Sequence, residues 1–260
     1  MMDEKSVKQR PSTVPRPAAL EALGLSRSYG DHLAVDNVSF EIFPGEVFGL
    51  LGPNGAGKTS LLRMLSGILE PDRGHARING QRVTRDARHL RRELGYLSGD
   101  TSLYGRLSVL EMLKYFGQLH GIAREQLETR INQMVQDFGL EAFQNQRCGA
   151  LSSGQSQRAN LARAFIADPK IVILDEPTVG LDVISGEFVV QAIERARAEK
   201  KAVLFSTHIM SEVDKLCDRI GLLLGGQLKA VGARNELLNS FDAADLSELI
   251  LKLHKEDSQR

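Results

Sequence analysis

The sequence predicts an α/β fold built on a largely parallel sheet, and three features of its apolar segments support this. Short apolar runs alternate with helical patterns along the 260-residue chain, which is typical of a sheet covered by helices. The runs are apolar at consecutive positions, as expected for strands buried on both faces. Each run is followed by polar or turn residues. The clearest of these expected strands are Val47–Leu51, Ile171–Leu174, Ala202–Phe205 and Ile220–Leu224.

Two stretches depart from this pattern. Leu33–Ile42 alternates apolar and polar residues, which favours a half-exposed antiparallel strand. With Leu20–Leu25 and Ala76–Ile78 it would form a small antiparallel β layer near the N-terminus. Between about residues 108 and 165 one helical pattern follows another, beginning with a capping-box sequence, Ser108-Val-Leu-Glu111. We therefore expect a helical insertion that divides the α/β core.

Composition and charge argue against several classes of protein. The 33 basic and 33 acidic residues give a formal net charge of zero, so no overall field would hold nucleic acid. No apolar stretch approaches the roughly 20 residues needed to cross a bilayer. The N-terminal residues lack the apolar core of a signal peptide. Cys148 and Cys217 lie far apart and are expected to be reduced thiols of a cytosolic protein, with no disulfide or metal role.

The strongest motif is a phosphate-binding loop of the form GxxxxGK[ST]. It reads Gly52-Pro53-Asn54-Gly55-Ala56-Gly57-Lys58-Thr59 and is followed by Ser60. An expected strand precedes it and a helical pattern follows, which is the context that the motif requires. The glycines let main-chain N–H groups face phosphates, and the helix adds its positive N-terminal end. Lys58 would then contact the β and γ phosphates of a nucleotide, and the Thr59 hydroxyl would bind Mg²⁺.

Two carboxylates follow the expected strand Ile171–Leu174. Because ligands of open parallel sheets bind at the carboxyl ends of the strands, Asp175 and Glu176 should face the phosphate loop. Asp175 suits a Mg²⁺ ligand, and Glu176 is placed to orient or deprotonate the attacking water. Without the loop, the same pair would be interpreted as a solvated turn. His208 follows the strand Ala202–Phe205 and could reach the γ-phosphate from the same edge.

A hydroxyl-rich turn precedes another expected helix, Ser156–Ala167. The turn reads Leu151-Ser152-Ser153-Gly154-Gln155. Ser152 or Ser153 would cap the helix and leave free main-chain N–H groups as a second anion site. Taken alone, the same residues would indicate no more than a capped helix.

With these motifs the chain resembles the ABC ATPase family, whose signature reads LSGGQ; here Ser153 replaces one glycine. The resemblance covers about residues 20–235, and the motifs appear in family order. By resemblance, Tyr29 would stack on adenine and Asp182 would belong to the D-loop, with His208 after it. The implied fold is a P-loop NTPase (RecA-like) core with a mainly parallel sheet, an N-terminal antiparallel β layer and a helical subdomain carrying the signature.

The resemblance also implies an activity and partners. ATP and Mg²⁺ would be the cofactors of an ATPase whose catalytic residues are Lys58, Glu176 and His208. The chain would form a head-to-tail dimer, in which the signature of one subunit closes over ATP bound by the loop of the other. An integral membrane permease and a second ATPase subunit are the implied partners. The implied location is the cytoplasmic face of the cell membrane, as a peripheral subunit.

The expected domain boundaries follow the same resemblance. We expect a flexible N-terminal extension at residues 1–18, an ABC ATPase domain at 19–240 and a C-terminal helical tail at 241–260. The helical subdomain would occupy about residues 100–165 of the ATPase domain.

Two further segments, 98–104 and 205–212, are similar to export-type ABC ATPases, especially the sodium-extruding NatA-like group. Most of the family has a glutamine that contacts Mg²⁺ and the membrane partner, where this chain has Ser98-Gly99-Asp100. Either water or the Asp100 carboxylate would complete the Mg²⁺ shell. We favour water, because a third carboxylate in the site adds repulsion. Alternatively, Asp100 caps its own turn.

Other classes of protein share parts of this pattern. A soluble ABC ATPase that acts on DNA would carry a long coiled coil between phosphate loop and signature, where this chain has a compact helical segment. Ribosome-acting members usually carry two cassettes, and a small-molecule kinase has no use for the signature. We therefore favour a transporter subunit. Its cargo stays open among sodium, drugs, lipids and polysaccharides, because specificity belongs to the membrane subunit.

Overall fold

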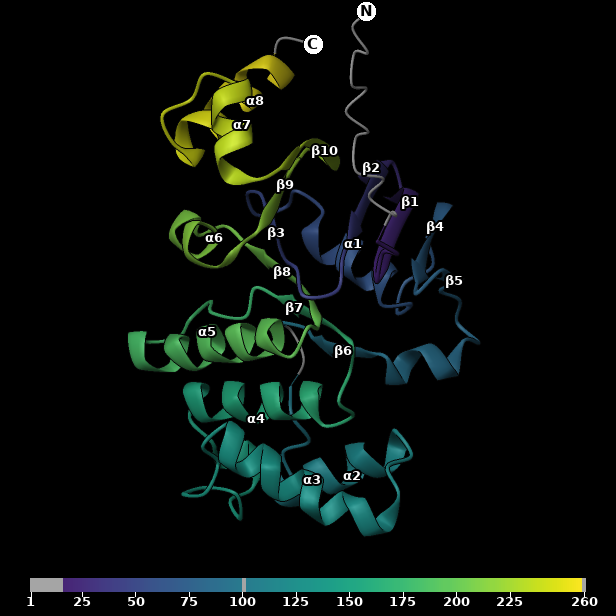
Figure 1. The fold of residues 1–260 in the computed structure, drawn as a ribbon, viewed down its shortest axis with the longest axis vertical. Helices are drawn as coiled ribbons and strands as arrows, with labels where there is room; N and C mark the ends of the chain where they lie inside the picture. The colour runs from purple at the N-terminus through teal and green to yellow at the C-terminus, as the bar shows by residue number, and fades with distance from the viewer. Residues whose placement is uncertain (1–15, 100–101, 259–260) are drawn as a thin grey trace, which may run out of the picture.

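A computed structural model describes residues 16–99 and 102–258 (Figure 1). The main sheet has the strand order β10-β9-β3-β8-β7-β6, and its pairs are parallel except for β9 with β10. Its strands are β3 (Val47–Leu51), β6 (Leu94–Leu97), β7 (Ile171–Asp175), β8 (Ala202–Thr207), β9 (Arg219–Leu224) and β10 (Gln227–Gly232). The mainly parallel sheet predicted from the sequence is thus confirmed, and all four expected strands are present.

A second, antiparallel sheet has the order β2-β1-β4-β5. Its strands are β1 (Leu20–Tyr29), β2 (His32–Ile42), β4 (Arg73–Ile78) and β5 (Gln81–Arg82). This confirms the antiparallel layer near the N-terminus. Residues 1–15 of the expected N-terminal extension, and Asp100, lie outside the described residues.

The helices are α1 (Lys58–Leu65), α2 (Val109–Leu119), α3 (Arg124–Asp137), α4 (Ser153–Phe165), α5 (Val183–Ala198), α6 (Met210–Leu216), α7 (Arg234–Ser240) and α8 (Leu246–Ser258). Figure 1 shows α2, α3 and α4 together at one end of the molecule, and α7 and α8 at the other. The predicted capping box before α2 is present: Ser108 Oγ accepts from Glu111 N at 3.2 Å, and Ser108 N donates to Glu111 Oε2 at 2.8 Å. Among the described residues, no helix has the length and apolar character needed to cross a membrane.

The main sheet has apolar residues on both faces because each face packs against a separate core. On β7, Val172 and Leu174 belong to the core beneath the helices α2–α5. Ile171 and Ile173 point the opposite way, into the core shared with α1 and the antiparallel sheet. The alternation of side chains along a strand therefore explains why the whole run had to be apolar.

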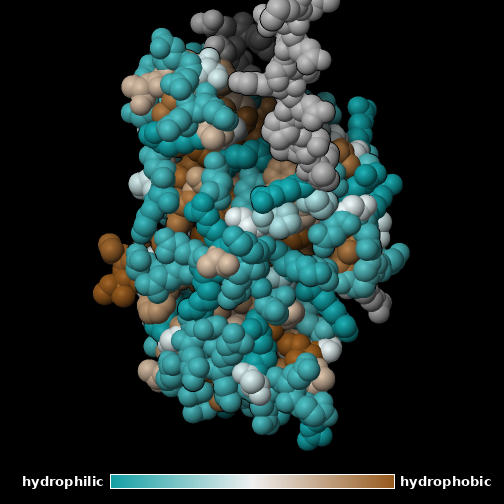
Figure 2. Space-filling view, viewed as in Figure 1, coloured by the Kyte–Doolittle hydropathy of each residue, from teal (hydrophilic) through white to brown (hydrophobic). Residues whose placement is uncertain are grey.

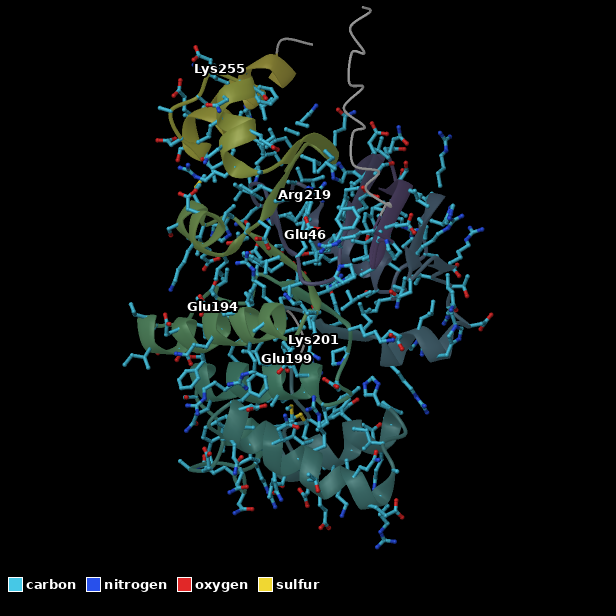
Figure 3. The ribbon with its side chains drawn as sticks, viewed as in Figure 1. Glu46, Glu194, Glu199, Lys201, Arg219 and Lys255 are labelled. Atoms are coloured by element: carbon cyan, nitrogen blue, oxygen red, sulfur yellow. The ribbon has the colours of Figure 1, made fainter. Side chains whose placement is uncertain are left out.

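Ion pairs secure the amino ends of the central strands. Glu46, just before β3, lies 3.0 Å from Arg219 at the start of β9 (Figure 3). Lys201, just before β8, lies 2.6 Å from Asp168 and 3.2 Å from Glu199. These pairs lie at the end of the sheet opposite to Asp175, so we assign them a structural role. The carboxyl ends of the strands carry the groups discussed next.

Candidate nucleotide site

The phosphate loop connects β3 to α1. Gly57 is the N-cap of α1 and adopts φ 99°, a left-handed conformation that favours glycine. Lys58 is therefore the first residue of the helix, whereas the helical pattern in the sequence, Ser60–Leu65, begins two residues later. The first N–H groups of a helix have no partner within it, so the start of α1 offers free donors and a positive helix end to an anion.

The Lys58 ammonium lies beneath this loop and is almost fully buried. It donates to the main-chain oxygens of Gly52 at 2.8 Å and Pro53 at 3.1 Å. It also lies 3.0 Å from Oε1 of Glu176. The loop lysine and one of the two predicted carboxylates thus meet, although 118 positions separate them in the sequence (176 minus 58).

Strand β8 holds both acidic residues, Asp175 through its carboxylate and Glu176 through its main chain. Ser206 Oγ donates to Oδ1 of Asp175 at 2.7 Å and accepts from the main-chain N–H of Glu176 at 2.9 Å. Asp175 is 3% exposed, so few water molecules can reach it. His208 Nδ1 lies 3.3 Å from Oε2 of Glu176. Lys58, Glu176 and His208 therefore form one contiguous cluster.

A cavity of about 620 Å³ opens over two members of this cluster, Lys58 and Glu176. Its lining includes these candidate residues: Tyr29, Asn54, Gly55, Gly57, Lys58, Thr59, Ser60, Asp175 and Glu176. The Tyr29 ring is 47% exposed at the rim, and its hydroxyl lies 3.3 Å from Ser60 Oγ. An exposed ring beside an anion-binding loop is suited to stack on a nucleotide base.

The signature residues do not line this cavity. The segment Leu151–Gln155 opens α4, which begins three residues earlier than the helix expected at Ser156. Ser152 is the N-cap, which decides between the two serines: its Oγ accepts from Gln155 N at 3.3 Å. Its N–H in turn donates to Oε1 of Gln155 at 2.9 Å. Gly52, Pro53, Ala56, Asp182 and the predicted catalytic residue His208 also lie outside the cavity lining.

Asp182 is the N-cap of α5. Its Oδ1 accepts from Ser185 N at 2.8 Å, and its Oδ2 accepts from Ser185 Oγ at 3.1 Å. These hydrogen bonds, first of all the one from the Ser185 main chain, lower the pKa of Asp182 below its ordinary value. Asp182 is therefore charged at neutral pH and stabilises the N-terminal end of α5.

Some groups at the site were not predicted. Ser206 contacts the Asp175 carboxylate and the main-chain N–H of Glu176, and the register of the sheet explains this, because Ser206 pairs with Asp175 in the β7–β8 ladder. Gln157 and Gly99 also line the cavity. A sequence signal existed for Ser206, since it directly follows the expected strand Ala202–Phe205. Gln157 gave no such signal, because its proximity depends on how α4 packs.

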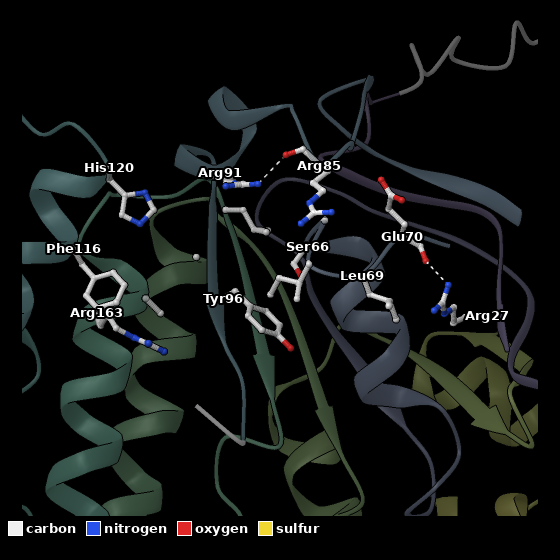
Figure 4. A pocket seen from close by; sticks show the side chains of 15 residues that line it. Arg27, Ser66, Leu69, Glu70, Arg85, Arg91, Tyr96, Phe116, His120 and Arg163 are labelled. Atoms are coloured by element: carbon white, nitrogen blue, oxygen red, sulfur yellow. Dashed lines mark hydrogen bonds between the residues drawn. The ribbon is translucent and has the colours of Figure 1, made fainter. Parts of the chain in front are cut away.

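A second cavity, of about 750 Å³, lies between the helical region and the antiparallel sheet (Figure 4). It shares no lining residue with the nucleotide cavity. Figure 4 shows Phe116, His120 and Arg163 on one side and Arg85 on the other. Burial, followed by the nearby Arg92 charge, lowers the pKa of His120, which is therefore mainly neutral at pH 7.

Comparisons with known proteins agree with this geometry. Residues 35–179 match the family model described as ABC transporter. The chain is 39% identical over 219 residues to the ABC transporter ATP-binding protein NatA of Bacillus subtilis, covering 84% of this chain and 89% of that protein. It is 38% identical over 232 residues to the Nod factor export ATP-binding protein I of Paraburkholderia xenovorans, covering 89% and 76% of the two chains.

Solved structures show the same architecture. An ATP-binding subunit of an ABC transporter has a TM-score of 0.84 at 30% identity, covering 91% of this chain and 99% of that one. A bacterial ABC transporter cassette solved as a dimer has a TM-score of 0.75 at 26% identity, covering 82% and 98%. The fold and its loop thus define a P-loop ATPase. The chain belongs to the ABC transporter family, as an ATP-binding subunit of the kind that works with a membrane permease.

Proposed function

We propose that two copies of this chain close over ATP and that its hydrolysis powers export through a separate permease. The observation that carries the catalytic part is the 3.0 Å contact between Lys58 and Glu176 at the base of the cavity. It brings a phosphate-binding cation and a candidate general base to one point. Export is favoured by similarity to the Nod factor export ATP-binding protein. The sodium cargo of the NatA-like resemblance stays a prediction.

Each residue of the cluster has a proposed role. The α1 N-terminus and Lys58 bind the phosphates, while Glu176 accepts the proton of the attacking water. When phosphate oxygens compete for Lys58, the Glu176 carboxylate is released from that ion pair. His208, 3.3 Å from Glu176, then orients the same carboxylate and contacts the γ-phosphate. Tyr29 stacks on the base.

The residues present fit Mg²⁺. The ion prefers oxygen ligands and is usually held by one or two carboxylates together with substrate phosphates. Asp175 and Thr59 supply a carboxylate and a hydroxyl at the cavity, so we assign the metal to these two residues. The ion would neutralise phosphate charge. Ser98 is buried, while Asp100 lies outside the described residues, so the choice between water and Asp100 stays a prediction.

A homodimer is supported by an apolar patch at the start of α5. Val183 is 91% exposed, Ile184 is 76% exposed and Val179, which also lines the nucleotide cavity, is 50% exposed. Figure 2 shows an apolar projection at the left edge of the molecule, at the level of α5. Since the patch adjoins both the Asp182 turn and the ATP cavity, we assign a second copy of the chain as its occupant.

Ile184→Asp should therefore block ATP-dependent dimerisation. The measurement is sedimentation of a Glu176→Gln background with and without ATP, where slow hydrolysis lets the dimer accumulate. Leu251→Asp is the matched control, because Leu251 is an exposed leucine on α8. We expect dimers in the background and in the control, and monomers with Ile184→Asp or Ser152→Arg. A mass that ATP never changes would contradict the dimer.

The second cavity is the proposed docking site of the permease. Among the described residues, no carboxylate lies within ion-pair distance of Arg85, Arg91 or Arg163, although all three line it. Arg91 donates to the main-chain oxygen of Arg85 at 2.8 Å, and Arg163 packs over the Phe116 ring at 5.2 Å. Unpaired arginines around a hollow favour an acidic cytoplasmic segment.

Arg85→Glu with Arg91→Glu should detach the membrane protein that co-purifies with the chain. The charge reversal repels an acidic segment, while the ATPase site is untouched. Co-purification from detergent extract and ATP hydrolysis by the free chain are measured side by side. Arg77→Glu with Arg82→Glu, on the exposed antiparallel sheet, is the control. Retained binding in the Arg85/Arg91 variant would rule out this docking site.

A further inference from the structure

A side chain of the signature helix α4 forms a hydrogen bond with the catalytic turn of its own chain. Gln157, on α4, donates from Nε2 to the main-chain oxygen of Pro177, the residue that follows Glu176. The same side chain lines the nucleotide cavity. We propose that Gln157 is a positioning residue, which holds the turn so that the Glu176 carboxylate faces the attacking water. This inference rests on the proposed role of Glu176 as the general base.

The turn needs such support because its backbone is strained. Glu176 has φ 45°, in the left-handed region that residues other than glycine rarely adopt. It also precedes a proline, which restricts its backbone further. Strained residues keep their conformation only where surrounding contacts determine it. The contacts that hold this one are therefore part of the catalytic geometry.

Two side chains from different elements form hydrogen bonds with the main chain of the turn. Ser206 of β8 accepts from the Glu176 N–H at 2.9 Å, and Gln157 of α4 donates to the Pro177 oxygen. The carboxylate itself is held by Lys58 at 3.0 Å. Phosphates would draw Lys58 away when ATP binds, which removes one restraint at the moment of reaction. Gln157 and Ser206 then hold the turn, with His208 beside the carboxylate.

Close packing of α4 against α5 fixes the position of Gln157 relative to the turn that contains Pro177. A Cβ added at Gly154, one helical turn before Gln157, would lie 2.2 Å from Ser185 Oγ. Ser185 in turn bonds the Asp182 cap of α5. The first turn of α4 is thus seated directly on the start of α5, which fixes the distance from α4 to the turn that holds Pro177. A side-chain amide at position 157 can then reach the same carbonyl reproducibly.

The test removes the donor while keeping the length of the side chain. Gln157→Met and Gln157→Glu should lower kcat by about 10- to 100-fold, because a small misplacement of a catalytic group costs that much. ATP affinity, measured by calorimetry, should stay unchanged. Gln157→Lys keeps a donor and should restore most of the rate. Gln144→Met is the matched control: Gln144 Nε2 donates to a main-chain oxygen, that of Glu141, at 3.3 Å on the exposed surface.

A double variant shows whether Gln157 acts through Glu176. Adding Gln157→Met to Glu176→Gln should cause no further loss, because the carboxylate that it positions is already gone. Equal losses in both backgrounds, or a weaker ATP affinity with kcat unchanged, would overturn the positioning role. Unchanged kcat in Gln157→Met would overturn it as well. If Glu176→Gln itself hydrolysed ATP normally, the proposed function would fail instead, whatever Gln157 does.

Discussion

Glu176→Gln should bind ATP as tightly as the natural chain and hydrolyse it about 10²- to 10⁴-fold more slowly, the usual contribution of a general base. The amide has nearly the shape of the carboxylate but does not accept the proton of the attacking water. The hydrogen bond to Ser206 comes from the main chain of Glu176, so the turn keeps its anchor. The loss of the ion pair with Lys58 leaves that lysine free for phosphate.

Two measurements separate binding from chemistry in this variant. Equilibrium calorimetry gives the ATP affinity, and single-turnover hydrolysis gives the chemical rate. Glu212→Gln is the control at the same edge of the sheet, because Glu212 accepts from Thr207 Oγ1 at 2.6 Å and does not line the cavity. A variant of Glu176 that lost affinity and rate together would show that another group is the base.

The parts of this site that the sequence predicted share one physical origin. Val47–Leu51 and Ile171–Leu174 had to be apolar throughout because separate cores cover the two faces of the sheet. Parallel strands then bring their carboxyl ends to one edge, so a loop after the first and carboxylates after the second must approach each other. Local pattern and sheet geometry together therefore predicted the meeting of Lys58 and Glu176.

The remaining contacts depend on packing between elements, which local patterns do not encode. Gln157 reaches Pro177 because α4 is seated on α5, and this seating depends on the absence of a side chain at Gly154. Helix α1 starts at Lys58 because Gly57 adopts a left-handed backbone conformation. The helical pattern alone placed the start of this helix two residues later. The Gln157 contact and the first residue of α1 follow from close packing between elements in three dimensions, so the sequence pattern did not predict them.

Gly57→Ala should abolish ATP binding as completely as Lys58→Ala, but for a steric reason. A Cβ at Gly57 would lie 2.2 Å from the main-chain oxygen of Ala34, on β2 of the antiparallel sheet. The loop or the strand must move, and the backbone at φ 99° is strained for alanine in addition. Either movement displaces the free N–H groups at the start of α1. Lys58→Ala instead leaves the loop in place and removes its charge.

Gly55→Ala separates the steric cause from the conformational one. Gly55 also has a positive φ, 81°, but no atom lies within 4 Å of an added Cβ. This variant carries backbone strain of about 1–3 kcal/mol without a clash, so it should keep measurable ATP affinity. Calorimetry with ATP compares the three variants, and thermal unfolding shows that each is folded. Equal ATP affinities of Gly57→Ala and Gly55→Ala would contradict this explanation. The close contact with Ala34 would then not fix the loop conformation, and phosphate binding would depend on the Lys58 charge alone.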